Sequence, residues 1–163
     1  MEKIKDIIFL PEQPKFLENK EFQKCKLKEQ NYYNATIHNC TFINCDISES
    51  NFSKAKLSNC RFINCNLQFC AMTKIEIQNC EFINCDLWHS NLCHSIIYET
   101  LFNNCIIRAL FKDLDWQNNT FDENTIVESC GGTICGLNEK IIYELIQSSK
   151  RSIDKENKLI VVK

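Results

Sequence analysis

The chain has 163 residues, 44% of them hydrophobic and 25% charged, with a formal net charge of −2 at pH 7. These values are ordinary for one soluble domain and by themselves exclude little. The sequence has neither a run of about 18 apolar residues nor a signal-peptide pattern. We therefore expect a cytoplasmic protein that does not bind a membrane.

The first 16 residues contain one apolar run, Ile7-Ile8-Phe9-Leu10, directly before Pro11. This run predicts a short strand or plug at the start of the fold, and a disordered leader is the alternative. We assign residues 1–16 as an N-terminal cap or leader.

Residues 17–128 repeat with a period of five. Every fifth residue from Phe22 to Ile107 is large and apolar in eighteen consecutive units. A helix would rotate by about 140° per five-residue step, and a strand would alternate faces, so neither element could bury all of them. The eighteen residues are Phe22, Leu27, Tyr32, Ile37, Phe42, Ile47, Phe52, Leu57, Phe62, Leu67, Met72, Ile77, Phe82, Leu87, Leu92, Ile97, Phe102 and Ile107.

A second position, two residues before each large one, is small in fifteen of the eighteen units and is most often cysteine. Only Lys20, Gln30 and Ile75 depart from this rule. A second inward position that accepts small side chains indicates that the chain turns a corner within every five residues. Asparagine often precedes the small residue, and it tolerates the backbone conformation that such a corner needs.

A period of twenty is superimposed on the period of five. Residues 39–45 recur at 59–65 and 79–85 with one difference, at Thr41, Arg61 and Glu81. Twenty residues make four sides of five, so we predict an all-β solenoid with a quadrilateral cross-section and coils about 4.8 Å apart. Its predicted core includes the stacked residues Phe22, Phe42, Phe62, Phe82 and Phe102 and the inward thiols Cys45, Cys65 and Cys85.

The frame slips by one residue after Ile107 and continues through Phe111, Trp116, Phe121 and Ile126. We expect a local bulge or bent corner at the slip, with the last coil still formed.

Units such as Ala55-Lys56-Leu57-Ser58-Asn59 and Cys85-Asp86-Leu87-Trp88-His89 resemble the A(D/N)Lxx signature of pentapeptide-repeat proteins. The resemblance covers about two thirds of the chain. It implies the right-handed quadrilateral β-helix of that family, and it says little about function because one fold serves many roles.

Residues 129–163 are predicted to be a C-terminal cap. Asn138 can begin a helix that runs to about Ser149, with Leu137, Ile141, Ile142, Leu145 and Ile146 on one stripe that covers the last coil. The tail Leu159-Ile160-Val161-Val162 packs back on the solenoid or pairs with a second subunit. The resemblance adds weight to a homodimer formed through this C-terminal region.

No residue pattern indicates catalysis, a cofactor or a metal site. Nine of the twelve cysteines occupy the small inward position, where buried thiols are inert packing groups. The cluster of Trp88, His89, Cys93 and His94 falls at outward positions on different corners. Cys130 and Cys135 beside two glycines could chelate or bridge, but we do not favour this. We expect no enzyme, no cofactor and no metal.

Charge is distributed unevenly along the chain. Residues 1–75 carry eleven Lys/Arg and eight Asp/Glu, residues 76–128 carry two and nine, and residues 129–163 carry six and four, which gives +3, −7 and +2. Quinolone-resistance members of the resembled family are thought to present an acidic, DNA-like rod to gyrase. The candidate acidic residues here are Glu81, Asp86, Asp122 and Glu123, although an acidic face that serves solubility is the simpler interpretation.

The repeat also places Ile43, Ile63 and Ile83 in an outward apolar ladder. The other outward apolar residues are Phe69, Trp88, Ile96, Leu101, Ile106 and Leu110. Our first hypothesis is a non-enzymatic scaffold that binds a protein partner through its solenoid surface. The alternative is a DNA-mimicking modulator of a type II topoisomerase such as DNA gyrase. We expect no direct binding of nucleic acid.

Overall fold

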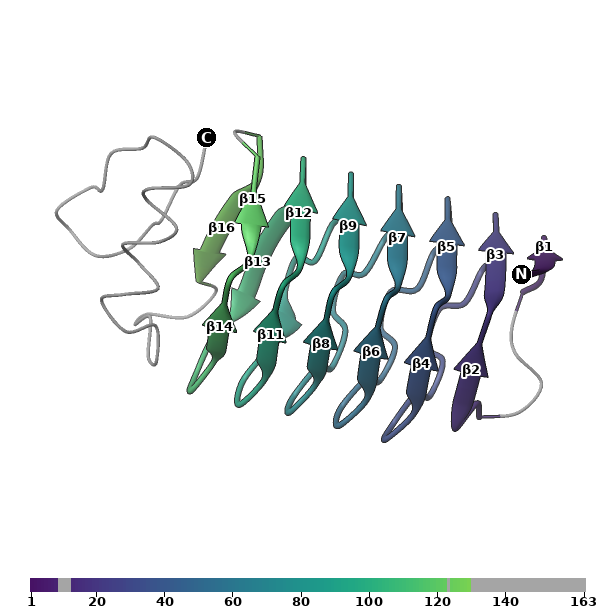
Figure 1. The fold of residues 1–163 in the computed structure, drawn as a ribbon, viewed down its shortest axis with the longest axis horizontal. Helices are drawn as coiled ribbons and strands as arrows, with labels where there is room; N and C mark the ends of the chain where they lie inside the picture. The colour runs from purple at the N-terminus through teal and green to yellow at the C-terminus, as the bar shows by residue number, and fades with distance from the viewer. Residues whose placement is uncertain (9–12, 123, 130–163) are drawn as a thin grey trace, which may run out of the picture.

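The computed structural model describes residues 1–8, 13–122 and 124–129, which form one parallel β-solenoid of about six coils (Figure 1). The prediction of an all-β solenoid is confirmed. The described residues contain no helix, and hence none that is long and apolar enough to cross a membrane.

Three parallel sheets run along the rod. The first contains β1 (Glu2–Lys5), β3 (Lys20–Gln23), β5 (Thr41–Ile43), β7 (Arg61–Ile63), β9 (Glu81–Ile83), β12 (Leu101–Asn103) and β15 (Thr120–Phe121). The second contains β2 (Phe16–Glu18), β4 (Thr36–His38), β6 (Lys56–Ser58), β8 (Glu76–Gln78), β11 (Ile96–Tyr98) and β14 (Asp115–Gln117). The third contains β10 (Ser90–Asn91), β13 (Ile106–Leu110) and β16 (Ile126–Ser129).

Each coil has four sides, which we number from the phenylalanine side. Strand partners are twenty residues apart through most of the rod, as Phe42 pairs with Phe62 and Ile37 with Leu57. One large inward residue marks each side of each coil. Side 1 buries Phe22, Phe42, Phe62, Phe82, Phe102 and Phe121; side 2 Leu27, Ile47, Leu67, Leu87, Ile107 and Val127; side 3 Tyr32, Phe52, Met72, Leu92 and Phe111; side 4 Leu17, Ile37, Leu57, Ile77, Ile97 and Trp116.

The predicted core is confirmed. The rings of Phe42 and Phe62 stack with centroids 4.8 Å apart and planes 5° apart, and the column continues through Phe82 at the same spacing. Each buried centre contributes roughly 1.5–3 kcal/mol of transfer free energy, so the column stabilises a narrow rod that has no second layer.

Corners are made by residues in the left-handed backbone region. Twenty-one non-glycine residues have positive φ, between 49° and 61°, and almost all of them lie two residues after an inward centre. Ten of them are asparagine, which visits this region more readily than most residues. The predicted role of asparagine at the corners is thereby confirmed.

Sides 1 and 4 differ from sides 2 and 3 in local structure. Sides 1 and 4 carry the two long sheets, whereas sides 2 and 3 turn more tightly and mostly begin with Asp or Asn, with Lys26, Ala71 and Ile106 as exceptions. The side-chain oxygen of Asp46 accepts a hydrogen bond from the backbone N–H of Ser48 at 3.2 Å, and Asn51 accepts from Ser53 at 3.0 Å. This local bond explains why the A(D/N)Lxx signature has an acidic or amide residue before its leucine.

At most small inward positions the side chain is also a hydrogen-bond donor, with Ala35 and Ala55 as exceptions. The Ser90 hydroxyl donates to the carbonyl of Leu67 at 2.8 Å, and the Cys85 thiol donates to the carbonyl of Phe62 at 3.3 Å. These carbonyls belong to the inward centre of the preceding coil, so each bond ties two coils together. Ile75, which breaks the small-residue rule, is nevertheless fully buried.

The structure places a strand earlier, at Glu2–Lys5; Ile7 and Ile8 lie outside that strand, and residues 9 and 10 of the predicted strand or plug lie outside the described residues. β1 pairs in parallel with β3 and places the partly buried Ile4 over Phe22, with Lys3 and Lys5 outward on the edge. Ile7 packs against the core and Ile8 is exposed. The alternation around Ile4 fits the phenylalanine column better than two adjacent isoleucines could, because neighbouring strand residues point to opposite faces.

The frame slip produces a straight segment, so the predicted bent corner is wrong; the register nevertheless changes by one residue there, as in a local bulge, because Asp86 pairs with Ile106 but Ser90 pairs with Ala109. In β13, Ile107 and Ala109 are buried, Leu110 is exposed, and Phe111 beyond the strand is buried again. The positive-φ residues pass from Asn104 directly to Asp113, so the corner that would fall between side 2 and side 3 has lost its left-handed residue. Without that residue the chain stays extended through the corner.

The last coil is formed, but Val127 rather than Ile126 is its inward residue on side 2. Val127 pairs with Ile107 and is buried, whereas Ile126 is only partly buried. An extra residue between Phe121 and Val127 restores the register lost at the slip. The predicted C-terminal helix, the tail, Cys130 and Cys135 lie outside the described residues.

Candidate interaction surface

Side 2 and the corner that follows it form a strip along the rod. In each coil, the outward residues of this strip form one row. The chemical character of the rows changes along the solenoid. The first five rows are Lys26, Lys28 and Glu29; Asp46, Ser48 and Glu49; Asn66, Gln68 and Phe69; Asp86, Trp88 and His89; and Ile106 with Arg108, and the backbone of the sixth coil continues in register with the fifth. Bridges from residue 26 through 46, 66 and 86 to 106 hold the rows in register.

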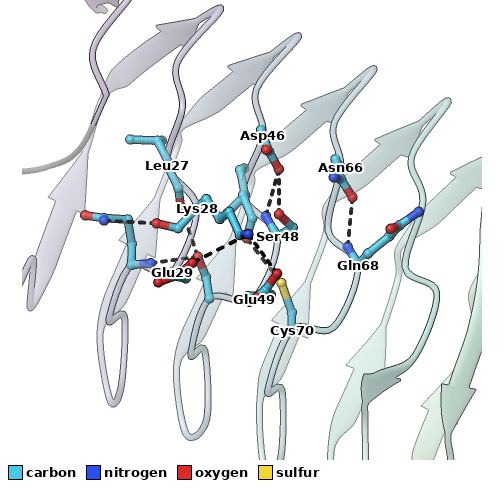
Figure 2. Close-up of polar contacts among 12 residues, drawn as sticks. Leu27, Lys28, Glu29, Asp46, Ser48, Glu49, Asn66, Gln68 and Cys70 are labelled. Carbon is cyan, nitrogen blue, oxygen red and sulfur yellow. Dashed lines mark hydrogen bonds and ion pairs between the residues drawn. The ribbon is translucent and has the colours of Figure 1, made fainter.

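The first two rows are charged and locally paired. Figure 2 shows Lys28 between Glu29 and Glu49, with its Nζ 2.9 Å from the Glu49 carboxylate and 3.5 Å from that of Glu29. The hydrogen bond and charge of Glu49 raise the pKa of Lys28 above its usual value. These residues are exposed, so the pairs add little stability and leave one net negative charge among the three.

In the second, third and fourth rows, the Asp or Asn at the start fixes the backbone that follows. Asn66 accepts a hydrogen bond from the backbone N–H of Gln68 at 3.1 Å, which is visible in Figure 2. Asp86 accepts from the backbone of Trp88 at 2.9 Å and from the side chain of Gln68 at 2.6 Å. The positions of Gln68 and Trp88 on the strip are therefore set by short local bonds.

Three aromatic rings meet on the outside of the third and fourth rows. Phe69 and His89 stack with centroids 5.6 Å apart and planes 5° apart. Trp88 makes edge contacts with both, at 5.2 Å from Phe69 and 4.2 Å from His89. The cluster is built from two successive coils, so the solenoid backbone holds the rings in place.

Phe69 sits at its corner at a cost to folding. Its φ is 58° and 48% of its surface is exposed, although asparagine fills the equivalent position at ten other corners. A bulky residue in the left-handed region costs about 1 kcal/mol or more, and an exposed ring gains little burial in return. In the free protein, Phe69 therefore improves neither the corner conformation nor the packing of the core. Such a residue is a candidate for contact with another molecule.

Two exposed apolar side chains flank the rings on the coil where the corner is straightened. Ile106, which is 37% exposed, lies beside Asp86, and Leu110, which is 40% exposed, lies beside Asn91. We call the group of Phe69, Trp88, His89, Ile106 and Leu110 the corner patch.

The isoleucine ladder lies on a different side of the rod. Ile43, Ile63 and Ile83 are in register on side 1, as the period of twenty predicted, and each is partly buried. A ladder of asparagine amides runs beside them along Asn44, Asn64, Asn84 and Asn104 at 2.8 to 3.0 Å, so the isoleucines are interleaved with polar groups. The corner patch presents more exposed apolar surface than this ladder.

The candidate acidic residues are spread over several sides. Glu81, on side 1, is paired with Arg61 at 2.7 Å. Asp86, on side 2, binds Gln68. Asp122 closes the last corner: partial burial opposes its ionisation, but hydrogen bonds from Thr125, Asn104 and Asn124 lower its pKa overall. Glu123 lies outside the described residues. The structure does not bring these carboxylates together in one column.

The described cysteines are all free thiols. The nine inward ones are buried and Cys93 is half-buried, as the repeat predicted. Burial raises the pKa of Cys40 to about 11 and that of Cys70 to about 12. His94 contacts Asp113 at 3.2 Å on a corner other than that of His89. Within residues 1–8, 13–122 and 124–129, no group of three potential ligands could hold a metal ion.

The sequence placed Phe69 and Trp88 outward but did not bring Phe69 and His89 together. The sequence does contain a signal for this pair. At the corner that follows side 2, residues 29, 49, 69 and 89 of successive coils are Glu, Glu, Phe and His. Twenty-residue spacing puts Phe69 and His89 on adjacent coils of one corner, so a search for aromatic residues at that spacing would have found the pair.

Two family models match the chain: "Pentapeptide repeat region" over residues 16–68 and "Pentapeptide repeats (8 copies)" over residues 60–97. No curated protein sequence matches it significantly.

Solved structures of similar fold include Rfr23, a pentapeptide repeat protein from the cyanobacterium Cyanothece 51142. It is 11% identical with a TM-score of 0.59, and the match covers 78% of this chain and 88% of that one. QnrB1, a plasmid-mediated fluoroquinolone resistance protein, is 17% identical with a TM-score of 0.43 and coverage of 90% and 93%. HetL, which is involved in heterocyst differentiation regulation in Nostoc sp. strain PCC 7120, is 13% identical with a TM-score of 0.36 and coverage of 81% and 56%. The first likeness supports the fold alone.

The family models together span residues 16–97, and the described coils carry the predicted five-residue units beyond residue 97 towards the C-terminus. The chain belongs to the pentapeptide repeat family.

Proposed function

We propose that this protein is a non-enzymatic scaffold whose solenoid positions the corner patch for contact with a protein. The observation that carries the proposal is Phe69, an exposed aromatic residue held at a positive φ beside Trp88 and His89. Aromatic rings on a rigid frame are typical of protein contacts, because they bury a large area and lose few rotamers on binding.

The alternative, a DNA-mimicking modulator of DNA gyrase, needs carboxylates in a continuous stripe that a basic groove can recognise. Here Glu76 and Glu81 are paired with Lys56 and Arg61, and they lie on sides 4 and 1 respectively. This arrangement favours the scaffold over the DNA mimic. The isoleucine ladder remains a second surface through which a protein partner could bind.

The proposal can be tested with a photo-activated cross-linking residue introduced at Gln68, which borders Phe69 and Trp88. The matched control is the same residue at Lys74. This exposed position lies in the same coil, at the corner that follows side 3. After irradiation of living cells, we expect a discrete cross-linked protein from position 68 and none from position 74. Equal labelling at both positions, or no product at 68, would contradict the proposal.

A further inference from the structure

Cysteine fills the small inward position at the start of side 2 in five successive coils. We call the column of Cys25, Cys45, Cys65, Cys85 and Cys105 the thiol ladder. All five side chains are buried, and each thiol donates a hydrogen bond to a carbonyl of the preceding coil, as Cys65 does to Phe42 at 3.4 Å. The side chain of Cys65 also hydrogen-bonds with those of Cys45 and Cys85. The ladder is therefore a continuous row of sulfur atoms along the inside of the rod.

The spacing of the coils suits a metal ion between two successive thiols. Bridges such as that of Asp46 with Asn66 keep the cysteines of neighbouring coils in register. The rings of Phe42 and Phe62, on the adjoining side, give a coil spacing of 4.8 Å. A metal–thiolate bond is about 2.3 Å long, so two collinear bonds span about 4.6 Å. A single ion therefore fits between two thiols of the ladder without a shift of the backbone.

Tyr32 is an independent sign of a ligand beside the ladder. Its side chain is fully buried, and its hydroxyl has no hydrogen-bond partner among the described residues. Burial and then the thiols of Cys45, Cys70 and Cys25 raise the pKa of this hydroxyl, so it lies near the sulfur atoms and stays protonated. Phe52 fills the same position of the next coil and stacks on Tyr32 at 4.5 Å. Phenylalanine would therefore pack here as well, without the cost of an unpaired buried donor.

We propose that the thiol ladder binds soft d10 metal ions of the Hg(II) type, each held by the collinear thiolates of two successive coils. Thiolate ligands select soft ions, and an ion of this type needs only two ligands in a line. The described residues contain no group of three potential ligands, and this site requires none. Two thiols release two protons when they bind one divalent ion, so the product is electrically neutral, as an apolar core requires.

Tyr32 lies at the N-terminal end of the ladder, where an ion can enter. Its hydroxyl can donate to a metal-bound sulfur of Cys25 or Cys45, which gives this donor the partner that it lacks in the free protein. The Cys25 thiol donates at 3.6 Å to the carbonyl of Ile4 in β1, the first strand of the rod (Figure 1). Terminal strands open at a small fraction of the free energy of global unfolding. An ion that enters there can then pass along the ladder by exchange between neighbouring thiols.

Binding to pairs makes the number of bound ions depend on which thiol is removed. The five thiols form two pairs and leave one thiol over. Cys45→Ser isolates the first thiol from the last three, and Cys85→Ser isolates the last thiol from the first three, so each variant should hold one ion fewer than the wild type. Cys65→Ser leaves one intact pair on each side of the substitution and should hold as many ions as the wild type.

The ions are counted by native mass spectrometry of the reduced full chain, after equilibration with Hg(II) and a small excess of glutathione, which removes ions held by single thiols. Cys70→Ser is the matched control. It removes a buried thiol whose neighbours in its own column are Ser50 and Ser90, so no ion should be lost. These serines donate to the preceding coil at 3.0 Å and 2.8 Å, so serine at an inward position is compatible with the fold.

Three results would overturn the inference. One is equal loss of ions in all four serine variants, which is expected when each thiol binds independently. Another is a wild type that retains no more ions than Cys45→Ser does. The third is loss of the β-sheet circular dichroism signal as ions are added, because the ions would then bind the unfolded chain. An unchanged spectrum, with two sulfur ligands at about 2.3 Å by X-ray absorption, is the expected result.

Tyr32→Phe tests the part of the site that lies beside the ladder. Without metal, this variant should be at least as stable as the wild type, because it removes an unpaired buried hydroxyl. It should nevertheless bind one of the ions severalfold more weakly, because the metal-bound sulfur loses its hydrogen-bond donor. A variant that binds every ion as tightly as the wild type would overturn the assignment of Tyr32 to this site.

Discussion

The side-chain amide of Asn64 donates a hydrogen bond to the side-chain oxygen of Asn44, 3.0 Å away and one coil earlier. Asn84 donates in turn to Asn64 at 2.8 Å. All three residues have positive φ, so one residue type both makes the corner and links it to the next coil. Asn64→Ala removes both contributions and should lower the free energy of unfolding by about 1–2 kcal/mol.

Asn64→Gly separates the two effects, because glycine keeps the left-handed backbone and loses the ladder. Chemical denaturation should rank the proteins wild type, Gly and then Ala in stability. An Ala variant as stable as the Gly variant would show that the corner conformation carries no cost.

Side-chain direction within the repeat gives a second prediction. Phe62→Asp buries a carboxylate without a partner, and Cys65→Arg forces a long cation into the small inward position, so each should cost several kcal/mol. Arg61→Glu, on the outside of the same strand, loses an exposed ion pair with Glu81 and sets two exposed carboxylates opposite each other, so it should cost only about 1 kcal/mol. Comparable losses in all three variants would be incompatible with the inward and outward positions described here.

Much of this fold follows from the sequence because each inward side chain obeys a strict period. The period of five identifies Phe62 and Cys65 as core residues, and the period of twenty stacks Phe42 on Phe62. The start and end of the rod were harder to predict, since β1 and β13 depart from the spacing: Ile4 is eighteen residues from its partner Phe22, and a corner residue is missing before Phe111.

The corner patch was only partly predictable for a similar reason. Trp88 and Phe69 fall outward in the repeat, but ring orientation and the exposed fraction depend on neighbouring coils. The donor role of Cys85 and Ser90 was also hidden, because the sequence pattern reports only that those side chains are small.

Thiol accessibility gives a third prediction. In the native protein, the nine inward cysteines should resist alkylation while Cys93, which is half-buried at the surface, reacts. Mass spectrometry after a short pulse of iodoacetamide measures both groups in one sample. Rapid labelling of Cys45 or Cys65, or a disulfide between them, would contradict the assigned core.

The dependence of stability on alkaline pH gives a fourth prediction. Burial raises the pKa of Cys70 from 9.0 to about 12, so the folded protein retains a proton that the unfolded chain releases. The stabilisation is therefore complete below pH 9 and is lost as the pH rises towards 12. Between about pH 9 and 11, the unfolding free energy of the wild type should fall as the pH rises. In Cys70→Ala this slope should be shallower by up to about 1.4 kcal/mol per pH unit.

Identical slopes for Cys70→Ala and the wild type would mean that Cys70 ionises equally in both states.

The DNA-mimic alternative predicts a different result from the scaffold. Because the carboxylates lie on several sides and Glu81 is paired, we expect no change in gyrase supercoiling, with or without a quinolone, as the protein is titrated. Inhibition or protection that weakens steeply with salt, and that is lost when Glu81 and Asp86 are neutralised, would favour the alternative. An apolar contact at the isoleucine ladder would instead be insensitive to salt and damaged by Ile63→Lys.

The most direct test of a contact role for the corner patch measures Phe69→Asn twice, for stability and for cross-linking from position 68. Asparagine suits a φ of 58° better than phenylalanine, so the variant should unfold at the same or higher denaturant concentration than the wild type while its cross-linked product disappears. A gain in stability with a loss of contact would identify Phe69 as a residue kept for binding. A variant that is less stable than the wild type, or that still cross-links as the wild type does, would contradict the account.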